Sequence, residues 1–353
     1  MEDLTKKLFD LVETGKVDEF RSLIKDNHDS QNLHNESGMN LLMQAAYKGH
    51  YEMCKYLLEC GVEVNETIPD NQYTALMMAG LSGKKDVVSL LLTNGANVEK
   101  QNSIGKTAIE LTSFVGQHDC ANLMKNFLSL DKLEPYYTKQ GDNEPRITKG
   151  VAASLQKILA STNPHPVKIV LSLMDSPELC NRINIKKTVS VLEDFCGKCV
   201  RSKNDYDEIL ALKVHYYSMI LDLCREFLVR HEDKKLDPLV KQLLLADGDG
   251  FQVAVEKMIR KSILAFPHSE LPLMEHYVRT IHPVTIGSNP TSFSCLLNMF
   301  NGMHSTAQRT NVCQACGSND SPLRCGACKA VSYCSKRCQK MHWFVHKKFC
   351  KKS

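Results

Sequence analysis

Residues 73–98 read YTALMMAGLSGKKDVVSLLLTNGANV, a stretch with two short apolar segments separated by a glycine. The first segment ends near Gly83, and glycine adopts at little cost the positive φ that often closes a helix. The second segment carries paired leucines and ends at Gly95, where a polar turn begins. This pattern predicts two short helices joined by a glycine turn.

The same pattern recurs through the first third of the chain. Glycines spaced by 34, 34 and 33 residues close the first segments, at Gly15, Gly49, Gly83 and Gly116. Paired aliphatic residues keep the same register, at Leu23-Ile24, Leu57-Leu58 and Leu91-Leu92. A helical pair cannot bury its apolar face alone, so consecutive units must stack. We therefore expect a mainly α chain in which residues 1–128 form a solenoid of about four repeats.

These units resemble the ankyrin-repeat family, most clearly at residues 73–79 and 90–98. Residues 4–34 lack the family's opening motif, which suits an N-terminal cap, and residues 102–128 deviate where Ala-Ala becomes Thr112-Ser113. The outer two repeats are thus atypical. The resemblance implies a non-catalytic array that binds a folded client through a concave surface of hairpin tips and first helices. The alternative is that the array only scaffolds the C-terminal half of the chain.

The composition is that of a folded protein. Of the 353 residues, 43% are apolar and 24% are charged, which argues against disorder and against a fibrous protein. No stretch approaches the roughly 18 apolar residues of a membrane-spanning helix, and residues 1–7 lack a signal peptide's apolar segment. Paired cysteines favour metal ligation in a reducing compartment. We therefore expect an intracellular, cytoplasmic protein without membrane insertion.

The middle of the chain is predicted to be helical. Residues 129–150 are polar and aperiodic, so we interpret them as a linker before a helical domain at 151–304. Prolines at or near the boundaries separate eight helix-like segments. These segments are 151–161, 164–174, 185–202, 205–231, 235–246, 251–265, 269–281 and 290–302. No catalytic family is recognisable in this domain.

Several partial motifs in the chain do not complete their sites. Gly105-Lys106-Thr107 lacks the first glycine of a phosphate-binding loop, and Asp247-Gly248-Asp249 lacks the later ligands of a calcium loop. The pair Cys196 and Cys199 has no second pair nearby, so we interpret it as two core thiols rather than as a metal or redox site.

Four ligand pairs lie between residues 313 and 350. They are Cys313-x2-Cys316, Cys325-x2-Cys328, Cys334-x3-Cys338 and His346-x3-Cys350. Eight ligands predict two tetrahedral zinc sites with no position left for water, so both zinc ions should be structural. So short a segment cannot fold on its apolar core alone, and zinc binding, worth roughly 10 to 16 kcal/mol per site, would supply the folding free energy.

The ligand pattern resembles the MYND zinc-finger family, in which the pairs interleave as a cross-brace. The resemblance assigns one zinc to Cys313, Cys316, Cys334 and Cys338, and the other to Cys325, Cys328, His346 and Cys350. His342 lies one helical turn from both Cys338 and His346 and could compete as a ligand, but the family pattern leaves it outside the ligand set.

The MYND resemblance also implies binding of peptides of the type Pro-x-Leu-x-Pro, laid along a short strand and against a helix. The family's peptide contacts correspond to Gln339 and Trp343, while Gly326 stands where the family uses a serine, so one contact is missing. We expect the strand near residues 331–333 to be the edge that receives the peptide. The alternative for Trp343 is a core residue.

The C-terminal segment is basic. Residues 313–353 carry nine basic side chains and one acidic side chain, a local charge of +8. Two zinc ions bound by seven thiolates would lower this charge to about +5. Aromatic and recognition-helix patterning are absent, so the basic charge does not predict nucleic-acid binding.

The combination resembles a family of proteins that contain ankyrin repeats and a MYND domain. It implies a non-catalytic adaptor in the trafficking of signalling proteins to the primary cilium. One alternative is a MYND-containing enzyme. A lysine methyltransferase would need a SET domain with an Asn-His-Ser-type motif, which is absent, and a RING-type ubiquitin ligase would need another ligand order. The other alternative is a nuclear transcriptional co-regulator.

Overall fold

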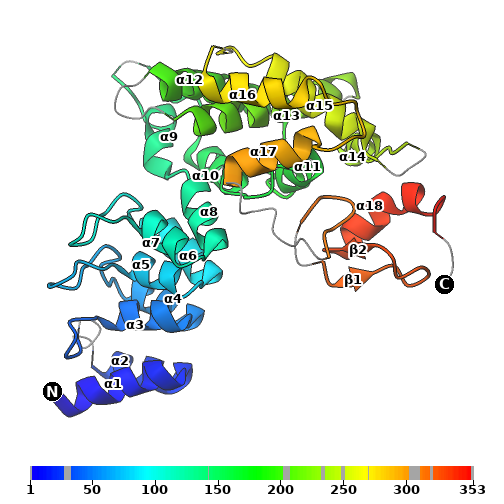
Figure 1. The fold of residues 1–353 in the computed structure, drawn as a ribbon. Coiled ribbons are helices and arrows are strands. Elements are labelled where there is room, and N and C mark those ends of the chain that lie inside the picture. Colours follow the sequence, from blue (N-terminus) through cyan, green and yellow to red (C-terminus); the bar gives the residue numbers. More distant parts are fainter. Residues whose placement is uncertain are drawn as a thin grey trace. The chain divides into compact units, whose positions relative to one another are not determined.

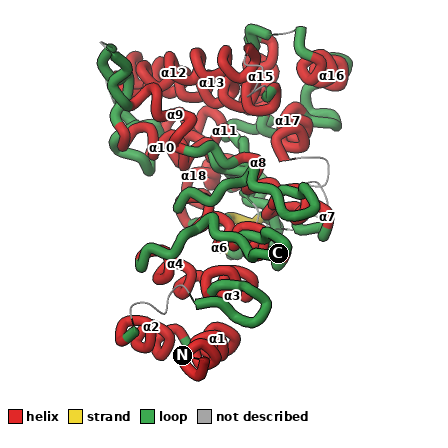
Figure 2. The backbone as a smooth tube through the Cα atoms, turned by 90° about the vertical axis from the view of Figure 1, so that its left-hand side faces the viewer, coloured by secondary structure: helices red, strands yellow, loops and turns green. Residues whose placement is uncertain are grey.

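A computed structural model describes nine stretches of the chain (Figure 1). They are residues 2–27, 33–141, 143–201, 207–231, 235–247, 251–268, 270–301, 311–318 and 321–350. The chain divides into two compact units, Met1–Ser129 and Leu130–Ser353. Nearly all regular structure is helical, and the small yellow segment in Figure 2 is the single sheet of the described residues. The predicted mainly α fold is confirmed.

The first unit consists of four helical pairs. The pairs are α1 (Glu2–Thr14) with α2 (Val17–Asp26), α3 (Leu41–Lys48) with α4 (Tyr51–Glu59), α5 (Ala75–Leu81) with α6 (Lys85–Thr93), and α7 (Ala108–Phe114) with α8 (His118–Asn126). The first helices stack in one layer and the second helices in another. At least one aliphatic residue of each predicted pair is fully or almost fully buried, as at Ile24, Leu57 and Leu91.

Turn and cap chemistry define each repeat. The four glycines that set the period all have positive φ, between 70° and 86°. The side chains of Asn40, Thr74 and Thr107 cap the first helices of the later repeats by accepting a backbone N–H three residues on. The Lys106-Thr107 pair therefore belongs to the turn that starts α7 and not to a phosphate-binding loop.

The second unit begins with helices inside the predicted linker and helical domain. They are α9 (Leu130–Tyr137), α10 (Lys149–Leu159), α11 (Pro166–Met174), α12 (Arg182–Arg201), α13 (Glu208–Arg230), α14 (Asp237–Leu243), α15 (Val253–Leu264), α16 (Pro272–Ile281) and α17 (Ser292–Asn301). Each of the eight predicted segments overlaps one helix. The two longest, α12 and α13, pack against each other.

Helix α9 lies within residues 129–150, which the sequence predicts as a linker. It packs because Tyr136 is buried and donates a hydrogen bond to Asp194 of α12 at 2.7 Å. The second unit therefore begins at Leu130, near the start of the segment predicted as a linker.

The thiols of Cys196 and Cys199 are both buried within α12, and Cys196 donates to the carbonyl of Ala211. Burial raises the pKa of Cys196 to about 11, so this thiol stays protonated and unreactive. Residues 248–250 of the calcium-like segment lie outside the described residues. No helix in the described part of the chain is long and apolar enough to cross a membrane.

Candidate metal centre

The C-terminal finger is built from three short elements. Strand β1 (Leu323–Arg324) pairs antiparallel with β2 (Ser332–Tyr333), and α18 (Lys336–His346) follows. Ser335 caps α18 by accepting the backbone N–H of Cys338, which fixes where the helix starts. Tyr333 is fully buried between these elements. Such short elements position the ligand residues without a large apolar core.

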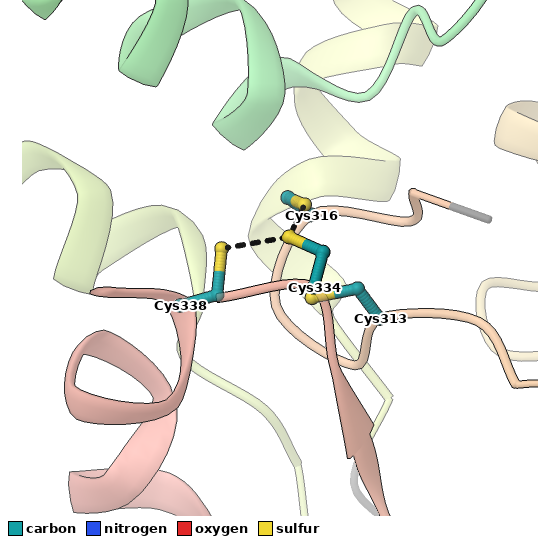
Figure 3. Close-up of side chains that lie close together, drawn as sticks. All are labelled: Cys313, Cys316, Cys334 and Cys338. Atoms are coloured by element: carbon teal, nitrogen blue, oxygen red, sulfur yellow. Dashed lines mark hydrogen bonds between the residues drawn. The ribbon is translucent and has the colours of Figure 1, made fainter. Parts of the chain in front are cut away.

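The first cluster joins Cys313, Cys316, Cys334 and Cys338. Figure 3 shows that their sulfur atoms approach one another from three segments of the finger. The Sγ atom of Cys334 lies 3.6 Å from those of both Cys316 and Cys338. A tetrahedral zinc with Zn–S bonds of about 2.3 Å separates its sulfurs by roughly 3.8 Å, so the spacing fits one zinc ion.

The second cluster joins Cys325, Cys328, His346 and Cys350. The sulfurs of Cys325 and Cys350 are 3.8 Å apart, and Nε2 of His346 lies 3.4 Å from the sulfur of Cys328. His346 is the last residue of α18, and Cys338 lies in its first turn. The helix therefore carries a ligand of the first cluster near its start and a ligand of the second cluster at its end. The two groups are the interleaved sets that the MYND resemblance implies, and their chemistry fits two zinc ions.

Both clusters favour thiolates at some positions. The pKa of Cys313 lies well below its usual value because the thiols of Cys316 and Cys338 donate to its sulfur. Backbone N–H groups, first that of Cys328, lower the pKa of Cys325 to about 6. In contrast, the pKa of Cys316 rises to about 12 because its thiol donates to Cys313. A bound zinc ion supplies the positive charge that lets all of these sulfurs be thiolates together.

His342 lies outside both clusters. Its side chain is buried, and its Nδ1 is 3.1 Å from the hydroxyl of Tyr333. Burial is the main cause that lowers the pKa of His342 to about 4, so the ring is neutral. This histidine therefore braces Tyr333 inside the finger.

The two predicted peptide contacts lie one turn apart on α18. Gln339 is half-buried, whereas 47% of Trp343 is exposed and its ring meets His346 edge to face at 5.9 Å. A side chain with this exposure is not a core residue, so the alternative interpretation of Trp343 is wrong. The indole instead offers a surface beside a ligand of the second cluster.

The prediction of an edge strand at residues 331–333 is wrong. Strand β2 pairs with β1 on one side, and on the other side Gln314 donates its backbone N–H to the carbonyl of Ser332 at 3.0 Å. The turn from Cys313 to Cys316, here called the first knuckle, thus occupies the edge that the prediction left open. Within it, Cys313 forms a parallel bridge with Ser332. Among the described residues, β1 is the strand paired on one side only.

Side chains of the helical domain also contact the finger, at the first knuckle and at α18. No pattern in the sequence predicts these contacts. Asn163 donates to the carbonyl of Cys316 at 2.9 Å, although 153 residues separate the two. Gln252 donates to the carbonyl of Gln314 at 3.0 Å. Arg337 of α18 pairs with Asp175 at 2.7 Å. The finger therefore folds against the helices of its own unit.

Comparisons with known families agree with this architecture. Residues 8–102 match the family described as ankyrin repeats (3 copies), and residues 312–350 match the MYND finger. The second match covers all eight ligand residues of the two clusters.

Individual relatives share different portions of the chain. Dauer abnormal formation protein 25 of Caenorhabditis elegans is 28% identical over 352 residues, which cover 97% of this chain and 89% of the relative. E3 ubiquitin-protein ligase hecd-1 of the same organism is 29% identical over 57% of this chain but only 6% of its own length. Human palmitoyltransferase ZDHHC17 is 33% identical over 34% of this chain and 18% of its own length. This chain therefore spans most of the first relative and only small parts of the two enzymes.

We predict that Cys325→Ser lowers the zinc content of the intact protein from two ions to one, because Cys325 belongs to the second cluster only. Amide hydrogen exchange should rise in residues 321–350 by local loss of folding free energy, while residues 33–129 exchange as before. Elemental analysis and exchange mass spectrometry measure both effects.

Cys180→Ser is the matched control, because Cys180 is a half-buried thiol outside both clusters. It should retain two zinc ions. A parent protein with fewer than two zinc ions after metal loading would contradict the assignment, and so would faster exchange throughout the first unit of the Cys325→Ser variant.

Proposed function

We propose that this chain, which joins ankyrin repeats to a MYND finger, is a non-catalytic adaptor with a separate protein partner for each module. The observation that carries the proposal is the closure of both metal clusters. Each cluster has four protein ligand atoms, and a tetrahedral zinc so bound keeps no position for water or substrate. The eight residues act as zinc ligands, and the zinc ions stabilise a binding module.

The ankyrin unit presents apolar side chains on its layer of first helices. Phe114 of α7 is 91% exposed and Tyr47 of α3 is 48% exposed. Both stand two residues before the glycine that closes their helix, so they occupy equivalent repeat positions. Exposed aromatic residues of this kind are typical of protein interfaces, which supports a folded client on this face.

The proposed peptide site of the finger combines side chains of α18 with the open edge of β1. Trp343 and Gln339 supply an apolar wall and an amide on α18, and β1 supplies a strand edge with backbone groups for an extended chain. Proline lowers the entropy cost of ordering such a chain. A proline-containing segment is therefore the proposed second partner.

The cellular role follows from the family resemblance. We propose that the adaptor works in the cytoplasm and in the trafficking of signalling proteins to the primary cilium. Affinity pull-downs with the intact protein, with a version lacking residues 1–128 and with a version lacking residues 313–353 test this role. Each truncation should lose its own set of partners, and ciliary signalling proteins should be among them. Loss of the same partners from both versions would contradict two separate binding modules.

The enzyme alternative has a direct test of its own. Intact zinc-loaded protein should give no product with tritiated S-adenosylmethionine and histones, or with ubiquitin, E1 and a panel of E2 enzymes. Robust product in either assay would overturn the adaptor proposal. The match to the ligase relative covers only 6% of the ligase's own length, so the ligase's activity is not evidence for this chain.

We predict that Trp343→Ala weakens binding of a labelled Pro-x-Leu-x-Pro peptide by about 2 kcal/mol, a common loss for an interface tryptophan. Zinc content should stay at two, because the side chain is half exposed and holds no metal. Fluorescence anisotropy and elemental analysis measure the two quantities. Phe349→Ala is the control, since Phe349 has the same 47% exposure within the finger. Zinc loss from the Trp343 variant, or unchanged affinity, would exclude the groove.

We predict that Gly326→Ser strengthens binding of the same peptide by about 1 kcal/mol, the usual contribution of one hydrogen bond. A Cβ at Gly326 would meet no atom within 4 Å, and the residue does not have positive φ, so a serine fits without strain. Gly326→Ala is the control, because it makes the same change in backbone freedom without adding the hydroxyl. Equal affinities of the serine and alanine variants would show that position 326 does not contact the peptide.

We predict that Phe114→Ala reduces recovery of the client of the ankyrin unit in a quantitative pull-down by about tenfold, equivalent to roughly 1.4 kcal/mol. Tyr51→Ala is the control, because Tyr51 is an exposed aromatic residue in the layer of second helices. Partners of the finger should be recovered equally from both variants. A greater loss from Tyr51→Ala would place the client on the opposite layer.

A further inference from the structure

A groove of about 800 Å3 lies on the helical pair α12 and α13. On α12, Ile183, Lys186, Lys187 and Ser190 recur at spacings of three and four residues and so share one helical face. On α13, Arg225 and Val229 lie one turn apart along the same groove. The two helices pack against each other and together supply most of the groove's lining.

The groove is strongly basic. Its lining contains five basic side chains and no acidic one, namely Arg146, Arg182, Lys186, Lys187 and Arg225. Acidic residues outside the lining pair with some of these cations, since Arg225 pairs with Asp222 at 2.6 Å and Arg146 lies 3.6 Å from Asp194. Lys186 and Lys187 are exposed and form no ion pair with any residue that the structure describes.

One cation of the groove is held in place. Arg146 donates two hydrogen bonds to Ser190, at 2.8 Å to its carbonyl and 2.7 Å to its hydroxyl. Its guanidinium also lies 5.5 Å from the ring centre of Tyr136. A positive charge that is fixed before binding loses less conformational entropy when a ligand arrives.

Apolar side chains lie among these charges. Ile183 is 68% exposed and Val229 is 49% exposed, and both line the groove. Single exposed aliphatic residues are common, but here two of them line one basic groove, so its lining is both apolar and positively charged. A suitable ligand therefore combines negative charge with an apolar group.

We propose that this groove binds an acidic segment of a partner protein, in which carboxylates flank an apolar side chain. The carboxylates contact Lys186 and Lys187, and the apolar side chain covers Ile183 and Val229. A free phosphate would gain nothing from the two aliphatic residues, and a bilayer surface is too flat to enter a groove. This site is additional to the ankyrin face and the finger, and it rests on different residues, so it would give the proposed adaptor a third binding surface.

The test uses the intact zinc-loaded protein and a fluorescently labelled peptide in which glutamates flank one leucine. Lys186→Glu/Lys187→Glu should weaken its binding by about tenfold, and added salt should weaken binding to the parent protein. Ile183→Ser/Val229→Ser should weaken binding of this leucine peptide. It should not weaken binding of an analogue in which serine replaces the leucine. A peptide with glutamine in place of glutamate should bind at least tenfold more weakly to the parent protein.

Lys257→Glu/Lys261→Glu is the matched control, because these exposed lysines on α15 lie one turn apart outside the groove. It changes the net charge equally and should leave peptide affinity unchanged. An equal loss of peptide affinity in this control would show that only the overall charge of the protein matters, and it would overturn the proposal. Absence of peptide binding would also overturn it, as would binding of inorganic phosphate or phosphatidylserine vesicles that depends on Lys186 and Lys187 while the peptide does not bind.

Discussion

The constraint on which this structure depends is that its parts are too small to bury enough apolar surface alone. A repeat of two short helices has one apolar face, which must be covered by the next repeat. Leu41, Leu57, Leu76 and Leu91 are fully or almost fully buried for this reason. The finger solves the same problem differently, since two ligand clusters fix segments that have few buried apolar side chains besides Tyr333.

These two solutions explain why binding surfaces remain available. Stacking uses the faces between repeats and leaves side chains exposed on the layer of first helices, among them Phe114 and Tyr47. Metal ligation fixes both ends of α18, at Cys338 and His346, without covering the helix face that carries Trp343. In both modules the stabilising contacts therefore leave exposed the side chains that are proposed to meet partners. Each of the two described clusters supplies four protein ligand atoms, so a tetrahedral zinc ion bound there keeps no position for water.

The sequence predicts those features that depend on spacing. A repeat period marks the ankyrin helices because every unit must present the same face, and ligand pairs mark the clusters because one metal needs side chains at fixed intervals. Spacing cannot show which backbone groups become paired. The error at residues 331–333 arose because Gln314 reaches the carbonyl of Ser332 from another part of the finger.

Features that join distant segments were also missed, since no local pattern encodes them. The bonds from Asn163 to Cys316 and from Gln252 to Gln314 connect polar side chains to backbone carbonyls. The packing of helix α9 depends on the hydrogen bond from Tyr136 to Asp194, and the basic groove depends on α12 lying beside α13. The same periodicity that places Lys186 and Lys187 on a solvated helix face does not distinguish a groove from an ordinary surface.

Zinc X-ray absorption spectroscopy on the intact protein tests the central claim, that closed metal sites make the finger a structural binding module, most directly. The clusters contain seven sulfur ligands and one nitrogen ligand for two ions. The spectrum should therefore fit an average of about three and a half sulfurs and half a nitrogen per zinc, with Zn–S distances near 2.3 Å. A fit that requires an oxygen ligand from water, or fewer sulfurs, would reveal an open coordination position and contradict the account.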